Sequence, residues 1–198
     1  MRLLNYLTED IDVQSLLKNN RIVDLYKKHN KFFYRGKKSP SIISEYQVFN
    51  RRKDRRPMDM PSHLHKDFDI EFQKKFSWKS RSEGVFAVAA SYVAQLYGTP
   101  YVFIPIEPFR YIYSLSITDL YREIKCDHFY ITYEEALILK SPKLYSKEEY
   151  QKIINKIVNS YRKDNIAHAL MKTTEVMFDC DRYLLINSTY INDFMEKL

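Results

Sequence analysis

Glycine is scarce in this chain: Gly36, Gly84 and Gly98 are the only three among 198 residues. Closely spaced glycines are what allow backbone amides to approach a phosphate group. The Rossmann dinucleotide turn and the P-loop both depend on such spacing. The sequence therefore excludes both motifs, and a nucleotide site in this chain would have to be built from side chains and another kind of turn.

Two of these glycines fall within residues 79–106, which read as a strand–helix–strand unit. Residues 85–90 form a short apolar run, which predicts a strand buried on both faces. Ser91 is expected to cap a short helix, and Gly98 to end it from the left-handed conformation. A second strand is expected over residues 101–106.

Composition points to one folded domain over residues 1–198, with residues 1–30 as an N-terminal helical segment. Apolar residues make up 45% of the chain and aromatic residues 15%, which excludes general disorder.

The apolar runs are too short for a membrane span, and the first eight residues are too polar for a signal peptide. We therefore expect a cytoplasmic protein with no membrane partner. Cys126 and Cys180 are expected to be buried free thiols.

The chain has a net charge of +7, and much of its positive charge is local, in the dense basic run of residues 51–56. Arg51, Arg52, Arg55 and Arg56 lie within this run, which is expected to be a loop. Such a run is either a solvated surface segment or a contact for phosphate, nucleic acid or another acceptor.

The early part of the chain predicts two short helices over residues 10–29 and then an aromatic strand that begins at Lys31 and is ended by Gly36. Arg35 is expected at the last position of that strand. At that position Arg35 is either an ordinary surface arginine or an arginine whose guanidinium points into a cleft.

His63 and His65 are two residues apart, but they are not expected to bind a metal ion together. Leu64, Phe68, Phe72 and Phe76 have helical spacing, and on a helix two residues two apart point to different sides. Capping or surface histidines are the better interpretation, and no metal cofactor is predicted.

The clearest helix of the chain is expected to begin at Ser146, because Glu149 completes a capping box before an apolar stripe. The other expected elements are a strand over 110–114, a helix over 117–124, a strand over 129–132, partial helix over 164–174, and paired strands or one bent strand over 175–181 and 183–186.

Several of these segments, in this order, resemble the ADP-ribosyltransferase fold. They are Tyr34-Arg35-Gly36 on an early strand, residues 85–91 with the helix ending at Gly98, and Glu175 opening a late strand. The runs 56–65, 76–86 and 97–101 are also similar to uncharacterised bacteriophage proteins associated with that fold. The resemblance covers roughly residues 32–120 and the segment at Glu175.

The resemblance implies an α+β domain with a split, mainly antiparallel sheet, and NAD as a substrate. Glu175 would be the catalytic carboxylate, offsetting positive charge as the nicotinamide–ribose bond breaks. Arg35 would hold phosphate or ribose, Gly36 would leave room for the nicotinamide carboxamide, and Tyr97 would stack on the ring. Arg81 and Ser82 would stand at the rim of the cleft.

The resemblance leaves the acceptor open. Thr173 stands two residues before Glu175, where several protein-modifying members carry Glu or Gln. Other acceptors, a nucleic-acid acceptor and simple NAD hydrolysis therefore all stay possible. The expectation is a phage-encoded NAD-dependent ADP-ribosyltransferase modifying a host protein or nucleic acid in the host cytoplasm. The alternatives are a non-catalytic basic protein that binds nucleic acid or a host protein, and a virion-associated structural protein.

Overall fold

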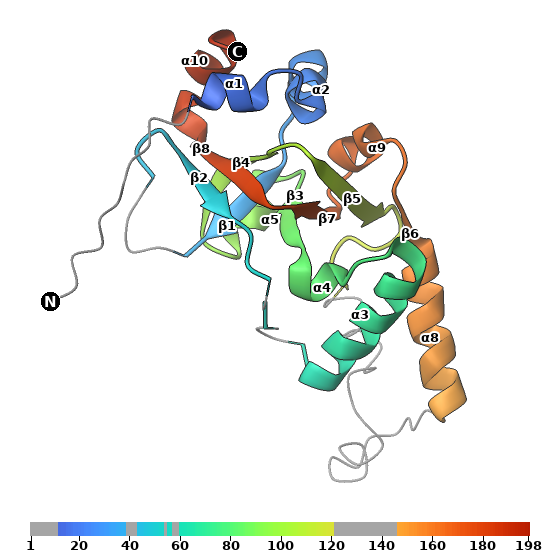
Figure 1. The fold of residues 1–198 in the computed structure, drawn as a ribbon. Coiled ribbons are helices and arrows are strands. Elements are labelled where there is room, and N and C mark those ends of the chain that lie inside the picture. Colours follow the sequence, from blue (N-terminus) through green and yellow to red (C-terminus); the bar gives the residue numbers. More distant parts are fainter. Residues whose placement is uncertain (1–11, 39–42, 54, 57–59, 121–145) are drawn as a thin grey trace, which may run out of the picture.

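The computed structural model describes residues 12–38, 43–53, 55–56, 60–120 and 146–198. In these residues the fold is α+β, with helices packed on one sheet of eight strands whose neighbours all run antiparallel (Figure 1). The α+β class and the mainly antiparallel sheet expected from the sequence are thereby confirmed.

The strands are β1 (Tyr34–Lys37), β2 (Tyr46–Asn50), β3 (Val85–Val88), β4 (Thr99–Pro105), β5 (Phe109–Ser114), β6 (Tyr161–Arg162), β7 (Glu175–Cys180) and β8 (Arg182–Asn187). The helices are α1 (Val13–Leu17), α2 (Arg21–His29), α3 (Ser62–Phe76), α4 (Ser80–Glu83), α5 (Ser91–Gln95), α8 (Lys147–Ser160), α9 (Ile166–Met171) and α10 (Ile191–Glu196), with a 3-10 turn, η1 (Ser188–Tyr190).

The sheet consists of two four-stranded halves. The strand order is β2-β8-β4-β1-β3-β7-β5-β6, and β1 meets β3 at a single register pair, Tyr34 with Val88. We call this junction the seam. The strands on either side of it have longer registers with their other neighbours, β1 with β4 and β3 with β7.

Two hydrophobic clusters hold the helices on the sheet. The larger one contains buried residues of α1, α2 and α9 together with Phe103 and Phe178 of the sheet. The second joins α3 and α8 to β3, β5 and β7, and the Tyr150 hydroxyl of α8 donates to Asp67 of α3 at 2.6 Å. In Figure 1 the helices α1, α2 and α10 lie at one end of the sheet and α3 and α8 at the other.

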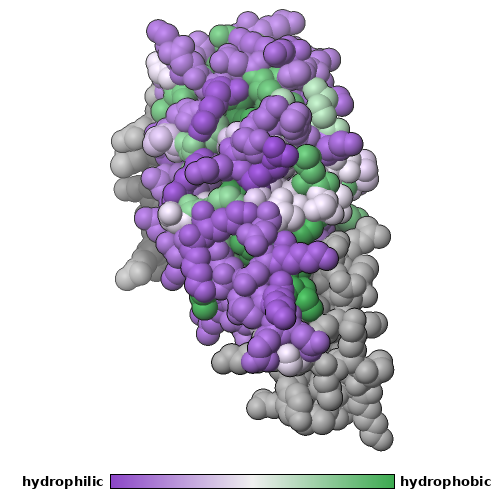
Figure 2. Space-filling model, turned by 90° about the vertical axis from the view of Figure 1, so that its right-hand side faces the viewer, coloured by the Kyte–Doolittle hydropathy of each residue, from purple (hydrophilic) through white to green (hydrophobic). Residues whose placement is uncertain are grey.

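The side of the molecule that carries α8 and α9 is mostly hydrophilic. Figure 2 views this side, and the apolar residues among its coloured atoms are scattered between polar ones. The apolar stripe of α8 is therefore directed inward, as the buried Ile154 and Val158 show.

The chain crosses the seam between β7 and β8. We expected residues 175–181 and 183–186 to be paired strands or one bent strand, and the paired alternative is wrong. β7 pairs with β3 and β5, whereas β8 pairs with β2 and β4. Only Asp181 separates the two strands, so one nearly continuous stretch of chain contributes a strand to each half.

Most of the expected elements are present, with shifted ends. The two N-terminal helices, the capping box of Ser146 with Glu149 and the partial helix over 164–174 are confirmed. Gly98 has a positive φ of +130°, but it does not end α5 as expected: the helix ends at Gln95 with Leu96 as its C-cap, and Gly98 lies in the turn before β4. Ser91 does not cap α5: the N-cap is Ala90, and no side chain caps the helix.

Three expectations fall outside the described residues: the thiol of Cys126, the strand over 129–132 and most of the helix over 117–124. Cys180 is described and is a buried free cysteine. Among the described residues, no helix combines the length and apolar character that a membrane crossing requires.

Candidate active site

A cavity of about 440 Å³ lies at the seam, within the size range of small-molecule and cofactor sites. Its walls come from β1, β3, the first residue of β7, β8, helix α5 with the turn after it, and the segment that follows β2. Four residues singled out from the sequence, Arg35, Gly36, Tyr97 and Glu175, lie together in its lining. They come from three distant parts of the chain.

Glu175 is placed by the strand register. It is the first residue of β7 and lies opposite Val88 of β3, which is itself opposite Tyr34 of β1. Its side chain is only 15% exposed, and its Oε1 accepts a hydrogen bond from Arg81 Nη1 at 3.3 Å. Burial raises the pKa of the Glu175 carboxyl, and the positive charge of Arg81 partly opposes this effect. Glu175 is therefore a desolvated carboxylate beside a cation.

Arg81 and Ser82 are anchored on α4 by Asp69 of α3. Asp69 Oδ1 accepts from the backbone N–H of Arg81 at 2.8 Å and of Ser82 at 3.3 Å, and Oδ2 accepts from the Ser82 hydroxyl. Arg81 is 8% exposed, so it lies behind Glu175 rather than at the rim where the resemblance put it. Neither Arg81 nor Ser82 is among the residues that line the cavity.

His65 belongs to the same buried network. Its Nε2 lies 3.0 Å from the Ser82 hydroxyl and 3.5 Å from Asp69 Oδ2. Burial lowers the pKa of His65, although the nearby Asp69 carboxylate acts in the opposite direction. In the described ranges, no group of three or more His, Cys, Asp or Glu side chains is arranged to hold a metal ion.

Arg35 occupies the second position of β1, so the expected end of the strand was misplaced by two residues. Its Nη1 donates to the carbonyl of Phe86 at 2.7 Å, across the seam, and its guanidinium lies 5.6 Å from the centre of the Tyr183 ring. Arg35 thus connects the two halves of the sheet while lining the cavity.

Arg55 reaches into the cavity from the segment after β2. Its guanidinium carbon lies 3.8 Å from the centre of the Phe86 ring, and that of Arg81 lies 4.8 Å from the same ring. Burial lowers the pKa of Arg55 to about 10, and the positive charge of Arg81 adds to this shift. Its Nη1 is buried and has no hydrogen-bond partner in the part of the chain that is described. An anion in the cavity would supply one.

Gly36 and Tyr97 bring α5 against β1. A Cβ built on Gly36 would lie 2.1 Å from the carbonyl oxygen of Ala94 and 2.9 Å from Cβ of Tyr97. The missing side chain therefore makes room for α5 rather than for a ligand. The Tyr97 hydroxyl donates to Asp119 at 2.8 Å, and burial together with this bond raises the pKa of Tyr97.

The basic run of residues 51–56 is divided by the fold. Arg52, Arg55 and Arg56 line the cavity, whereas Arg51 points to the other end of β7. Arg51 pairs with Asp179 through Nη1 and with Asp181 through Nη2, the latter at 2.9 Å. Arg51 therefore binds the two strands at the crossover and is not available to an acceptor.

Sequence reasoning missed Asp69, Phe86 and Tyr183. No local pattern links Asp69 to α4. Phe86 was counted as part of a buried strand, and Tyr183 as part of a late apolar piece. The contacts of all three depend on long-range packing, so no local signal could have identified them.

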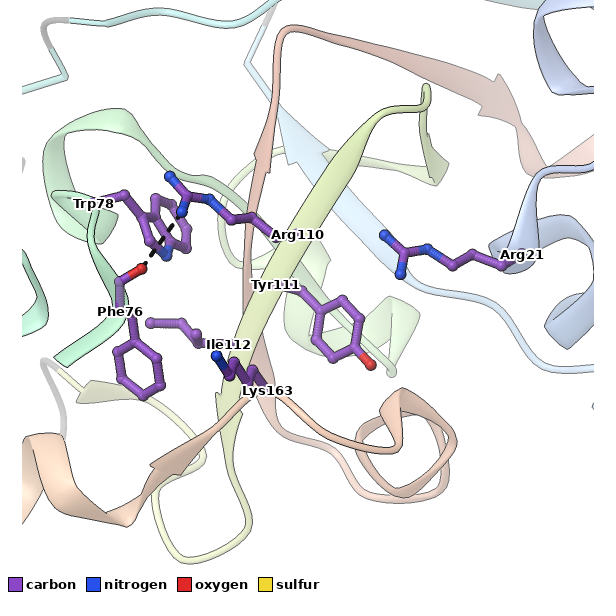
Figure 3. Close-up of a pocket in the computed structure, with 7 residues that line it drawn as sticks. All are labelled: Arg21, Phe76, Trp78, Arg110, Tyr111, Ile112 and Lys163. Carbon is purple, nitrogen blue, oxygen red and sulfur yellow. Dashed lines mark hydrogen bonds between the residues drawn. The ribbon is translucent and has the colours of Figure 1, made fainter.

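A second cavity, of about 220 Å³, lies along β5 (Figure 3). Arg110 reaches over Trp78 toward the carbonyl of Phe76, while Arg21 approaches from the opposite side of the strand. Both arginines have carboxylate partners: Arg110 pairs with Asp179 and Arg21 with Glu107. No carboxylate lines this cavity in the described residues, so it lacks the chemistry found at the seam.

Comparisons of this chain with protein-family models, with curated proteins and with solved structures gave no match.

Proposed function

We propose that the protein is an NAD-dependent ADP-ribosyltransferase whose active site is the cavity at the seam. The observation that carries the proposal is the meeting of Arg35, Tyr97 and Glu175 in the lining of one cavity. These were the residues that the resemblance to ADP-ribosyltransferases assigned to phosphate or ribose, nicotinamide and catalysis.

The charges of the cavity agree with a dinucleotide substrate. Arg35, Arg55 and Arg81 all act electrostatically on Glu175, and so does the carboxylate of Asp119. These three cations outnumber the two carboxylates, and the negatively charged diphosphate would supply the missing counter-charge. Arg35 and Arg55 line the cavity and are the residues that we assign to the diphosphate.

In the reaction, the bond between the anomeric carbon and the nicotinamide nitrogen breaks, and its electron pair leaves with nicotinamide. Positive charge develops on the ribose, and the Glu175 carboxylate stabilises it while holding a ribose hydroxyl. The ring of Tyr97 stacks on nicotinamide from the turn after α5. Arg81 keeps Glu175 in place, and it also favours the ionised form that this role requires.

The test is the release of nicotinamide from NAD by wild-type protein and by Glu175→Gln. We expect the substitution to lower turnover by about 10²- to 10³-fold, since it removes one electrostatic contact to the transition state. Glu45→Gln is the control, because Glu45 is exposed and outside the cavity lining. NAD binding by calorimetry should persist in Glu175→Gln.

Undiminished turnover in Glu175→Gln would overturn the catalytic assignment. Wild-type protein that neither releases nicotinamide nor binds NAD would overturn the proposed function, and would leave the alternative of a non-catalytic basic binding protein.

A further inference from the structure

The mouth of the cavity carries more positive charge than a dinucleotide can use. Besides the deeper Arg35 and Arg55, its lining contains the exposed Lys38, Arg52 and Arg56, as well as the half-buried Lys37. Among the described lining residues, Glu175 is the single acid. A second, polyanionic ligand fits this excess at the rim.

The other side of the rim is aromatic and exposed. Helix α5 and the turn after it present Tyr92, Leu96 and Tyr97 with 66%, 77% and 43% of their surface exposed. Single exposed apolar residues are common on proteins, but these three fall within six consecutive residues, and Tyr97 lines the cavity.

The two sides are held together by the tight packing of α5 on β1. A Cβ on Gly36 would meet Ala94 of α5, and a Cβ on Gly98 would meet the backbone of Lys37 and Lys38 within 2.6 Å. Lys37 and Lys38 at the end of β1 therefore lie against the turn that follows α5. We call the cations of the cavity mouth, together with the exposed tyrosines of α5 and this turn, the lip. Phosphate-binding cations next to exposed rings are the arrangement by which proteins bind single-stranded nucleic acid.

We propose that this lip binds single-stranded nucleic acid, which is the acceptor of the transferase reaction. The cations at the rim hold backbone phosphates and the exposed Tyr92 stacks on a base, while Tyr97 serves the nicotinamide ring as proposed above. A duplex fits less well, because its base faces are not exposed for stacking. An acidic protein also fits less well, because it would bind the cations but offer no flat base to the aromatic rings. The inference of an acceptor rests on the proposed function, whereas the inference of binding does not.

In the transfer step, a nucleophilic oxygen or nitrogen of the nucleic acid bonds to the anomeric carbon of the nicotinamide ribose. The bond from that carbon to nicotinamide breaks, nicotinamide leaves as a neutral molecule with the electron pair, and any proton on the nucleophile passes to water.

The first experiment measures binding without NAD, by fluorescence anisotropy of a labelled single-stranded 12-mer of mixed sequence. RNA, DNA and duplex DNA of the same sequence are compared from low to moderate salt. With three to four phosphate contacts, we expect log K to fall against log salt with a slope of about −2 to −3. Duplex should bind more weakly than either single strand.

Variants separate the two sides of the lip. Arg56→Ala should reduce the salt slope by about 0.7, the value of one phosphate contact to a single strand. Tyr92→Ala should weaken binding about tenfold with the slope unchanged, because it removes a stacking ring. The matched controls are Arg162→Ala and Tyr190→Ala, an exposed arginine and an exposed tyrosine outside the cavity lining, which should leave binding unchanged.

The second experiment follows transfer of label from radioactive NAD to the oligonucleotide. Transfer by wild type and its loss in Glu175→Gln, which keeps oligonucleotide binding, would support both proposals. Binding without any NAD turnover would overturn the proposed function and leave the binding surface standing. The inference would be overturned if the protein turns over NAD but binds no oligonucleotide. It would also be overturned if Arg56→Ala and Tyr92→Ala do not weaken oligonucleotide binding. Label that appears only on an acidic protein would overturn it as well.

Discussion

Arg81 Nη1 lies 3.3 Å from Glu175 Oε1, and both side chains are at least 85% shielded from solvent. The pair places a cation directly against the carboxylate that we assign to catalysis. Burial nevertheless raises the pKa of Glu175, so desolvation outweighs the attraction of the arginine. This balance gives the first prediction.

The proposed NAD turnover should be lost at acid pH because Glu175 must be ionised to act. Its pKa is raised from the ordinary 4.5, so the acid limb of kcat/KM should lie above pH 4.5. The folded state binds this proton more tightly than the unfolded chain does. The associated stability is therefore present below about pH 4.5 and is lost as pH rises through the folded-state pKa. A rate profile from pH 4 to 9 at constant ionic strength checks this, and an acid limb at or below 4.5 would contradict it.

Replacing Gly36 by alanine should disturb the contact between β1 and α5. The new Cβ would lie 2.1 Å from the Ala94 carbonyl oxygen, so α5 has to move. We expect a loss of about 2 kcal/mol in the free energy of unfolding, the usual cost of overpacking, and weaker NAD binding. The control is Ser91→Ala at the first position of α5, where the serine side chain caps nothing and the change should stay within about 0.5 kcal/mol. Urea unfolding would measure both, and equal stability of the two variants would refute the prediction.

Alanine substitutions of Arg51 and Arg162 should lower the free energy of unfolding by different amounts, because the two ion pairs differ in burial. Arg51 is 13% exposed and bonds Asp179, which is 16% exposed, while Arg162 and Asp164 are 41% and 57% exposed. Arg51→Ala removes a charged hydrogen bond from the buried Asp179 carboxylate, which keeps its bond to Arg110, and should cost about 2 kcal/mol. Arg162→Ala should cost much less, because solvent screens this exposed ion pair. Chemical denaturation of the two variants measures both losses of stability, and equal losses would contradict the prediction.

Removal of Asp69 should act on the site through α4. Asp69→Ala leaves the backbone N–H groups of Arg81 and Ser82 without their acceptor, which should lower the free energy of unfolding by about 2–4 kcal/mol. Because Arg81 would lose its anchor, the KM for NAD should rise as well. Asp193→Ala, at an exposed position in α10, serves as the control in both assays. A stability loss with KM and kcat unchanged would show that Asp69 does not position Arg81 for the site.

Patterns within about ten residues of one another predicted most of the elements. The capping box at Ser146 and the two N-terminal helices are local features, and the structure confirms them. The seam could not be predicted in the same way. It depends on which strands become neighbours, and the short apolar runs of β7 and β8 are equally compatible with pairing to each other.

The site shows the same division between local and long-range information. Arg51 and Arg55 belong to one basic run and look alike in sequence, but β2 ends at Asn50 and the chain then leaves the sheet. One arginine consequently bonds the acidic residues at the crossover, while the other stacks on Phe86 inside the cavity. Distinguishing them requires the positions of β7 and β3, which lie far away along the chain.

The crossover of β7 into β8 gives the sheet a pivot. Each half is continuous within itself, and the cavity lies where the two halves meet at the seam. Rotation of one half about Asp181 would alter the distance between Arg35 on one side and Glu175 on the other. Arg51 bonds Asp179 before this pivot and Asp181 at the pivot itself, so it restrains such a rotation from the end of β7 opposite Glu175.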